Sequence, residues 1–159
     1  MQSELTVSTR IAFAKAWCDE VAANYDRVAR KEAKLAELQS LQDGIKGVRY
    51  DRIGGGSGME HGDDAIASRQ QMIDDEMRNV EDAKFYAAEN AREFDHALDA
   101  INQTYARLLA MRYEERRTWK HIADELDYSA SHARYYIRNA ALLDLYDVMP
   151  ASRQMPAAI

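Results

Sequence analysis

Apolar side chains recur every three or four residues along the first part of the chain. They fall at Ile11, Ala14, Cys18, Val21, Tyr25 and Val28, and again at Leu35, Leu38, Leu41 and Ile45. This spacing is typical of one face of an α-helix and is close to a heptad repeat. We therefore predict one long helix that ends near residue 42, with a stripe that drifts in its last turns because the later spacing leaves the strict heptad.

A second stripe follows, and it repeats without interruption for about five heptads. Its members are Ile73, Met77, Val80, Lys84, Ala87, Ala91, Phe94, Leu98, Ile101, Tyr105 and Leu108, of which only Lys84 is not apolar. Two long helices with matching stripes predict an antiparallel helical hairpin over residues 1–104. A two-helix hairpin buries little surface of its own, so we expect it to pack with a second copy as a homodimer.

Residues 44–64, GIKGVRYDRIGGGSGMEHGDD, separate the two stripes and are rich in glycine. This composition favours a flexible connector between the two helices. A phosphate-binding loop is the alternative, but such a loop usually carries a Lys followed by Ser or Thr. Here the glycines are followed by Met59, Glu60 and further acidic residues, which would repel phosphate.

The segment 105–149 contains the pattern of a helix-turn-helix. Thr118 is a good N-cap for a helix over 119–126, Asp127 and Tyr128 form the turn, and Ser129 caps a helix that runs to about residue 145. The residues expected to fix the crossing of the two helices are small or apolar: Trp119, Ile122, Ala123, Leu126, Tyr128 and Ala133. The tail 150–159 is expected to be disordered.

The second helix of this pair carries side chains that suit the major groove of DNA. The residues expected to be exposed there are Ser131, His132, Arg134, Tyr135 and Arg138. Arginine can bind guanine through two hydrogen bonds, and the N-terminal part of such a helix meets base edges. Arg116, Arg117 and Lys120 precede or begin the first helix and would hold the phosphate backbone. The alternative is that these side chains form an ordinary solvated helix face.

Charge and composition narrow the choice of function. The net charge is −6, but residues 107–159 hold 8 Lys and Arg against 7 Asp and Glu, so the acidity belongs to the first two thirds. Cys18 is the single cysteine, which excludes an intramolecular disulfide and fits a cytoplasmic location. The chain has no long apolar run and no apolar signal core at its start, so we expect neither a membrane span nor secretion. No catalytic residue, metal ligand set or cofactor motif stands out, and we expect a binding protein rather than an enzyme.

The stretch TWKHIADELDYSASHARYYIRNAALLDL resembles the helix-turn-helix of region 4 of sigma-70 factors. The matching positions are Thr118, Ile122, Ala123, Leu126, Tyr128, Ser129, Ala141, Leu142 and Leu145, and YARLLAMRYEERRTW resembles the helix that leads into that motif. The order of a helical hairpin, Tyr50 with GGGSG, and this motif is similar to phage and prophage transcriptional regulators related to RinA and ArpU. The match departs at the turn, where Asp127 stands in place of a common glycine, although Asp tolerates a left-handed backbone.

The resemblance implies an all-α protein that binds double-stranded DNA at specific sequences as a dimer and regulates transcription. It leaves direct contact with RNA polymerase open. Two alternatives remain from the residues themselves. One is a DNA-packaging oligomer of the small-terminase kind, which also joins a helix-turn-helix to a helical oligomerisation region. The other is a coiled-coil interaction module that does not bind DNA.

Overall fold

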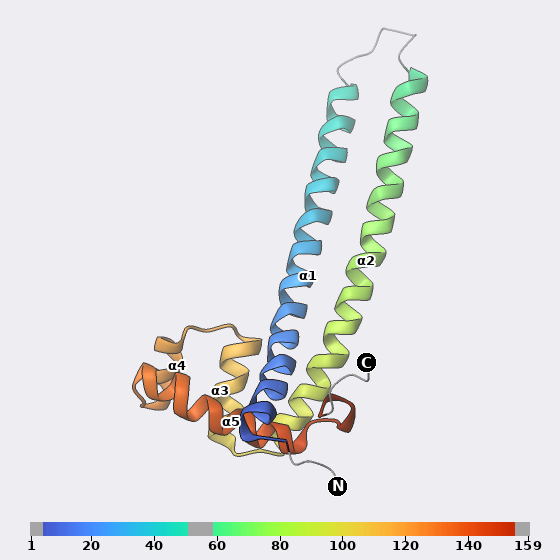
Figure 1. The fold of residues 1–159 in the computed structure, drawn as a ribbon. Coiled ribbons are helices and arrows are strands. Elements are labelled where there is room, and N and C mark those ends of the chain that lie inside the picture. Colours follow the sequence, from blue (N-terminus) through green and yellow to red (C-terminus); the bar gives the residue numbers. More distant parts are fainter. Residues whose placement is uncertain (1–4, 51–58, 155–159) are drawn as a thin grey trace. The chain divides into compact units, whose positions relative to one another are not determined.

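The computed structural model describes residues 5–50 and 59–154, and within this part of the chain every regular element is a helix. The long helices are α1 (Val7–Tyr50) and α2 (Met59–Asp99), and the shorter ones are α3 (Gln103–Leu109), the π-helix η1 (Ala110–Glu114), α4 (Trp119–Leu126), the π-helix η2 (His132–Ile137), α5 (Arg138–Val148) and the 3₁₀ turn η3 (Ala151–Arg153) (Figure 1). The predicted all-α class and the helical hairpin are confirmed.

The long helices extend further than the glycine pattern suggested. α1 continues to Tyr50 and α2 begins at Met59, so both reach into the expected connector 44–64. The rest of that connector, residues 51–58, lies outside the described residues. None of the helices described is both long and apolar enough to cross a membrane.

The chain forms two compact units. Unit 1 comprises residues 1–25 and 87–159, and unit 2 comprises residues 26–86. This division differs from the expected boundary between residues 104 and 105, because the first turns of α1 and the last turns of α2 share a hydrophobic core with the C-terminal helices. Trp17 and Phe94, both fully buried, meet edge to face with ring centroids 5.3 Å apart, and they belong to the same core cluster as Ile122, Leu142 and Leu145.

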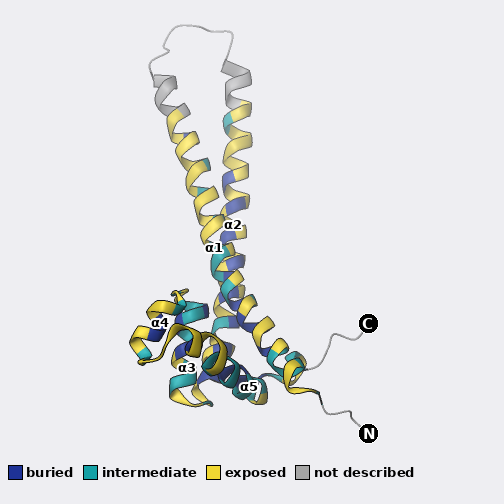
Figure 2. Cartoon of the chain, turned by 60° about the vertical axis from the view of Figure 1, so that its left-hand side comes forward, coloured by how far each residue is buried: buried dark blue, intermediate teal, exposed yellow. Residues whose placement is uncertain are grey.

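The buried face of α2 has a regular heptad register, but it is not the register expected from the apolar stripe. The buried residues are Ile73, Glu76, Val80, Ala83, Ala87, Asn90, Phe94 and Ala97, with Leu98 beside them. The apolar Met77 is 44% exposed, Lys84 is exposed and Ala91 is only partly buried. The expected stripe was therefore wrong at these three positions, where the neighbouring residue on the N-terminal side is buried instead. Figure 2 shows the buried residues of α2 as dark blue bands along the helix.

α1 shows the same kind of correction. The expected drift of its stripe is not observed, because Gln42 is buried whereas Leu41 is 55% exposed. Positions 14, 17, 21, 24, 28, 31, 35, 38 and 42 are all buried or partly buried, which is a heptad spacing that continues into the last described turns. Cys18 lies in the core as expected, fully buried.

Polar side chains on these buried faces are accommodated by specific partners. In unit 1, Trp17 Nε1 donates a hydrogen bond of 2.9 Å to Asn90 Oδ1. In unit 2, Lys34 Nζ lies 3.8 Å from Glu76 Oε2, and on the exposed side Lys84 pairs with Glu32 at 2.7 Å. A buried polar group costs free energy unless it is hydrogen-bonded, and these partners lower that cost for Asn90 Oδ1 and Glu76, whereas Asn24 Nδ2, Gln42 Oε1 and Asn90 Nδ2 are buried without a partner.

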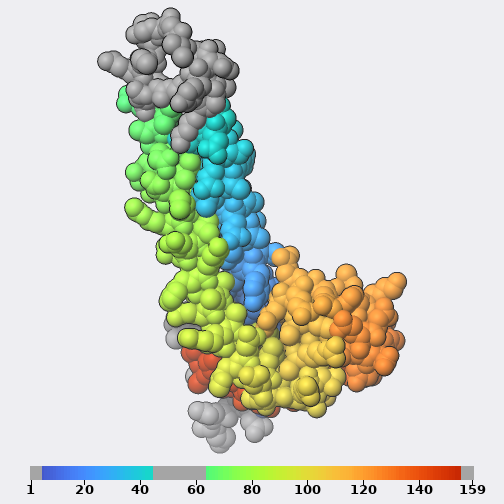
Figure 3. Space-filling model, turned by 180° about the vertical axis from the view of Figure 1, so that it is seen from behind, coloured from blue at the N-terminus to red at the C-terminus, as the bar shows by residue number. Residues whose placement is uncertain are grey.

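Unit 2 has little apolar core. Among its described residues the buried apolar side chains are Ile73, Val80 and Ala83, and the side chains of α1 and α2 pack against each other along it (Figure 3). Five large apolar side chains remain exposed on this unit: Leu41, Met72, Met77, Phe85 and Tyr86.

The expectation of a disordered tail from residue 150 is wrong for its first part. Residues Ala151–Arg153 form η3, and Arg153 anchors it to unit 1. The guanidinium pairs with Glu20 at 2.6 Å, lies 5.2 Å from the centroid of the Trp17 ring and donates to Asn90 Oδ1 at 3.3 Å. Residues 155–159 lie outside the described part of the chain.

Candidate nucleic-acid interface

α4 begins and ends as its sequence predicts. Thr118 has an extended backbone, and its hydroxyl accepts a hydrogen bond of 3.2 Å from the backbone N–H of His121, which satisfies one of the free donors at the helix start. α4 ends at Asp127, whose backbone is left-handed with φ 58° and ψ 40°. The left-handed turn expected at this Asp is therefore confirmed.

The second helix of the pair begins at Ser129, whose hydroxyl accepts a hydrogen bond of 3.1 Å from the N–H of His132. The helix then takes the π form over η2 before it continues as α5. Ala133 of η2 and Ala123 of α4 are both buried in the common core, and α4 packs against η2. Two small side chains allow the helices to approach closely at their crossing, as the helix-turn-helix pattern predicts.

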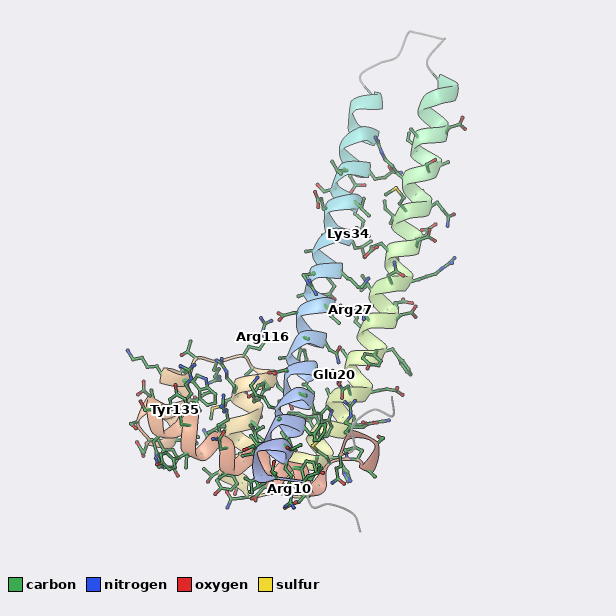
Figure 4. All side chains as sticks on the ribbon, viewed as in Figure 1. Arg10, Glu20, Arg27, Lys34, Arg116 and Tyr135 are labelled. Atoms are coloured by element: carbon green, nitrogen blue, oxygen red, sulfur yellow. The ribbon has the colours of Figure 1, made fainter. Side chains whose placement is uncertain are left out.

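The burial of Ala133 decides which side chains of η2 face outward. In a helix with about four residues per turn, positions two residues from Ala133 lie on roughly the opposite side. Those positions are Ser131 and Tyr135, and both are exposed. Tyr135 is 53% exposed and is labelled in Figure 4. The centre of the outward face is therefore formed by Ser131 and Tyr135.

Aromatic rings form one flank of this face. His132 stacks on Tyr136 with centroids 5.4 Å apart, and Tyr128 meets His132 at 5.3 Å. Tyr136 is 74% exposed and Tyr128 is 36% exposed. The expectation that Tyr128 belongs to the core was wrong: its ring joins this exposed aromatic row. Tyr136 was not among the expected contact residues, although its position four residues after His132 would have indicated it.

Arg134 and Arg138 lie on the other flank, but they differ in exposure. Arg134 is exposed, and its guanidinium carbon lies 5.3 Å from the centroid of the Tyr135 ring. The Arg138 residue as a whole is only partly buried. Its Nε atom, however, is fully buried and has no hydrogen-bond partner. Burial raises the pKa of Tyr113, and the positive charge of Arg138 acts in the opposite direction.

The expectation that Arg138 belongs to the exposed set was therefore wrong. That expectation assumed an α-helix, in which residues four apart share a face. η2 has π geometry, with hydrogen bonds from residue i to i+5, and this changes the angular relation between residues on either side of it. Arg138 is instead only partly exposed, and its Nε is buried.

Arg117 is engaged by acidic side chains within the protein. Its guanidinium pairs with Glu115 at 2.7 Å and with Glu125 at 2.6 Å, and Glu125 also pairs with Arg107 at 3.2 Å. His121 joins the same cluster at 3.3 Å from Glu125. These pairs link the segment before α4 to α4 itself, so Arg117 is a less suitable phosphate ligand than the sequence suggested.

Lys120 and Arg116 are exposed near the start of α4, and Arg116 has an interaction partner within the protein. Arg116 has a left-handed backbone with φ 60° in the segment between η1 and α4, and its position is labelled in Figure 4. The neighbouring Arg112 donates a hydrogen bond of 3.0 Å to the carbonyl of Arg117 and lies 5.0 Å over the half-buried Trp119 ring. This contact holds the segment that carries Arg116.

Acidic side chains are unevenly distributed over the two helices of this motif. Residues 128–138 contain no Asp or Glu, whereas α4 and the turn after it contain Asp124, Glu125 and Asp127. The outward face of η2 therefore offers hydroxyls, aromatic rings and a cation without a competing carboxylate of its own. Within the described residues, no group of three His, Cys, Asp or Glu side chains is arranged to hold a metal ion.

Comparisons with protein-family models, with curated proteins and with solved structures found no match to this chain.

Proposed function

We propose that the protein is a sequence-specific DNA-binding regulator of transcription, of phage or prophage type, that binds double-stranded DNA through α4 and η2. The observation that carries this proposal is the outward face of η2, which follows a left-handed turn, is free of acids over residues 128–138 and is backed by the buried Ala123 and Ala133. A helix-turn-helix uses the N-terminal part of its second helix in this way, with base edges in the major groove as its targets.

In this mechanism each part of unit 1 has a distinct role. η2 enters the major groove with Ser131 and Tyr135 at the centre of its contact. Lys120 at the start of α4 neutralises a phosphate on one side of the groove, and such contacts fix the orientation on the duplex. Arg134 reaches the edge of the groove. No bond is made or broken, so the activity is binding and not catalysis.

The dimer belongs to the same proposal. The thin apolar core of unit 2 and its exposed Leu41, Met72 and Met77 favour association with a second copy of the hairpin. Two copies would present two recognition helices, and the spacing between half-sites would follow from the dimer. RNA polymerase remains an open partner, since a regulator of this kind can act with or without touching it.

Selection of bound sites from random duplexes, followed by titration of the selected duplex and a scrambled one, tests the proposal. Lys120→Gln should weaken binding to both duplexes by a similar factor and make the salt dependence shallower by about one phosphate contact. Arg30→Gln is the matched control, because it removes the same charge from an exposed position of unit 2. Thermal melting of both variants confirms that they fold.

Three results would overturn parts of this proposal. Binding of the selected and scrambled duplexes with equal affinity would remove sequence specificity. Ring-sized assemblies in light scattering would favour the DNA-packaging alternative over a dimeric regulator. No affinity for any duplex at low salt would favour a protein-interaction module, which the exposed Tyr135 and Tyr136 would also suit, since tyrosine is enriched in protein interfaces.

A further inference from the structure

The centre of the recognition face carries an aromatic ring and not an arginine. Tyr135 lies opposite the buried Ala133 and is 53% exposed, and Tyr136 beside it is 74% exposed. Arg134 lies on the flank with its guanidinium against the Tyr135 ring, and Arg138 is only partly exposed with its Nε buried. Recognition of guanine by an arginine at the centre of this face therefore does not fit the arrangement of these side chains.

Large exposed aromatic side chains on a short helix call for an apolar partner surface. In the major groove of DNA, the only apolar group on a base edge is the C5-methyl group of thymine. An aromatic ring can cover such a methyl group, while the tyrosine hydroxyl at its tip remains able to donate to or accept from a neighbouring base or phosphate. Ser131, on the same line as Tyr135, adds a second hydroxyl.

We propose that Tyr135 and Tyr136 are specificity-determining residues that read thymine methyl groups in the major groove. This inference rests on the proposed DNA-binding function and names the base that the site recognises. It implies that the positions of the half-site facing the centre of η2 are A·T pairs. Arg134 then serves as a positioning residue, because its guanidinium lies over the Tyr135 ring and can meet a phosphate at the edge of the groove.

The aromatic row supports this role by restricting the rings before DNA arrives. Tyr136 stacks on His132 with an interplanar angle of 24°, and His132 in turn contacts Tyr128. Ordering a side chain on binding costs free energy, and rings that are already held by neighbours lose less freedom. The row also places Tyr136 beside Tyr135 without any carboxylate from residues 128–138 that would repel phosphate.

Replacement of thymine by deoxyuridine tests the proposal directly, because it removes the methyl group and leaves base pairing unchanged. Titrations use the full-length protein and the selected duplex, with thymines replaced one at a time at fixed salt. We expect affinity to fall about fourfold for each contacted methyl group, which is the fold-change that corresponds to burial of one such group. Thymines outside the contact should show no effect.

Variants assign the effect to the two tyrosines. Tyr135→Ala should weaken binding to the thymine duplex and abolish the difference between thymine and deoxyuridine at its position, whereas Tyr135→Phe should retain that difference because the ring remains. Tyr136→Ala should do the same at a neighbouring position. Tyr86→Ala is the matched control, since it removes a similarly exposed tyrosine from unit 2. Thermal melting of each variant confirms folding.

The outcomes separate this inference from the proposed function. Specific DNA binding that is unaffected by every deoxyuridine replacement would overturn the reading of thymine methyl groups and leave the DNA-binding proposal intact. Loss of the difference in the Tyr135→Phe variant, or its persistence in Tyr135→Ala and Tyr136→Ala, would also overturn it. Absence of affinity for any duplex would overturn both proposals.

Discussion

Glu114 is the side chain whose protonation should control the stability of unit 1. It lies at the end of η1, half-buried, and its Oε1 is buried without a hydrogen-bond partner. Burial raises the pKa of Glu114 to about 8, and the adjacent Asp95 of α2 adds to the rise through its charge and a hydrogen bond to the protonated form. When Glu114 and Asp95 are both ionised, neither can donate a hydrogen bond to the other. Protonation of Glu114 supplies the missing donor.

The sign of the effect follows from comparing the folded and unfolded states. Between pH 4.5, the ordinary pKa of Glu, and about pH 8, the folded protein binds more protons at this group than the unfolded chain. The free energy of unfolding should therefore fall as pH rises through this window. A pKa difference of one is worth about 1.4 kcal/mol, but Glu114 is open to solvent on one side, so we expect a total of only about 1–2 kcal/mol after screening.

The replacement Glu114→Gln removes the charge and keeps the shape and a donor. We expect it to be more stable than the unmodified protein at pH 8 by about 1–2 kcal/mol, a rise of roughly 2–8 °C in melting temperature for a chain of this size. Near pH 5 the two proteins should melt at similar temperatures. Thermal unfolding, followed by circular dichroism at pH 5, 6, 7 and 8, measures the difference in stability between the two proteins. The contributions of other titrating groups cancel in this difference because both proteins contain them.

Glu93→Gln provides the control, because Glu93 is exposed on α2 in the same unit. This variant should follow the pH dependence of the unmodified protein. The reasoning would be refuted if Glu114→Gln also kept that pH dependence, or if it were less stable than the unmodified protein at pH 8. Either result would mean that Glu114 is ionised at neutral pH without a cost to folding.

Four further predictions concern single side chains. Gly44→Ala should stabilise the protein by about 0.5–1 kcal/mol, because a Cβ on this helical glycine meets nothing within 4 Å; urea unfolding measures it. Asp127→Val should lower the unfolding free energy by about 1–2 kcal/mol and Asp127→Gly should not, since the turn is left-handed. Arg153→Ala should cost about 1–2 kcal/mol in the same assay through lost contacts with Glu20 and the Trp17 ring. Cys18 should resist alkylation by iodoacetamide until the protein unfolds, because burial raises the pKa of its thiol; labelling of the folded protein would contradict this.

Local rules in the sequence were sufficient for the elements that depend on neighbouring residues. The α-helical class, the N-cap at Thr118, the cap at Ser129 and the left-handed turn at Asp127 were all predicted, and each is observed. These features depend on hydrogen bonds and backbone angles within three or four residues. The function of this surface remains a prediction, because DNA binding depends on a second molecule and not on neighbouring residues alone.

Apolarity alone did not identify which face of each long helix is buried. The sequence favoured Leu41 and Met77, whereas the structure buries Gln42 and Glu76. A helix with apolar residues on adjacent faces is compatible with more than one stripe, and the stripe that is buried depends on the surface of the partner helix. Within unit 2, Lys34 approaches Glu76 from that partner, and no local pattern in α2 reveals this.

The outward face of η2 shows the same distinction between sequence and tertiary structure. The sequence by itself determined that a helix with Ser, His, Arg and Tyr follows a tight turn. Only the tertiary structure decided that Arg138 is partly buried, that Arg117 is held by Glu115 and Glu125, and that Tyr135 is exposed opposite Ala133. The physical reason is that charged groups take the partners that folding brings within reach, and those partners lie on other segments of the chain.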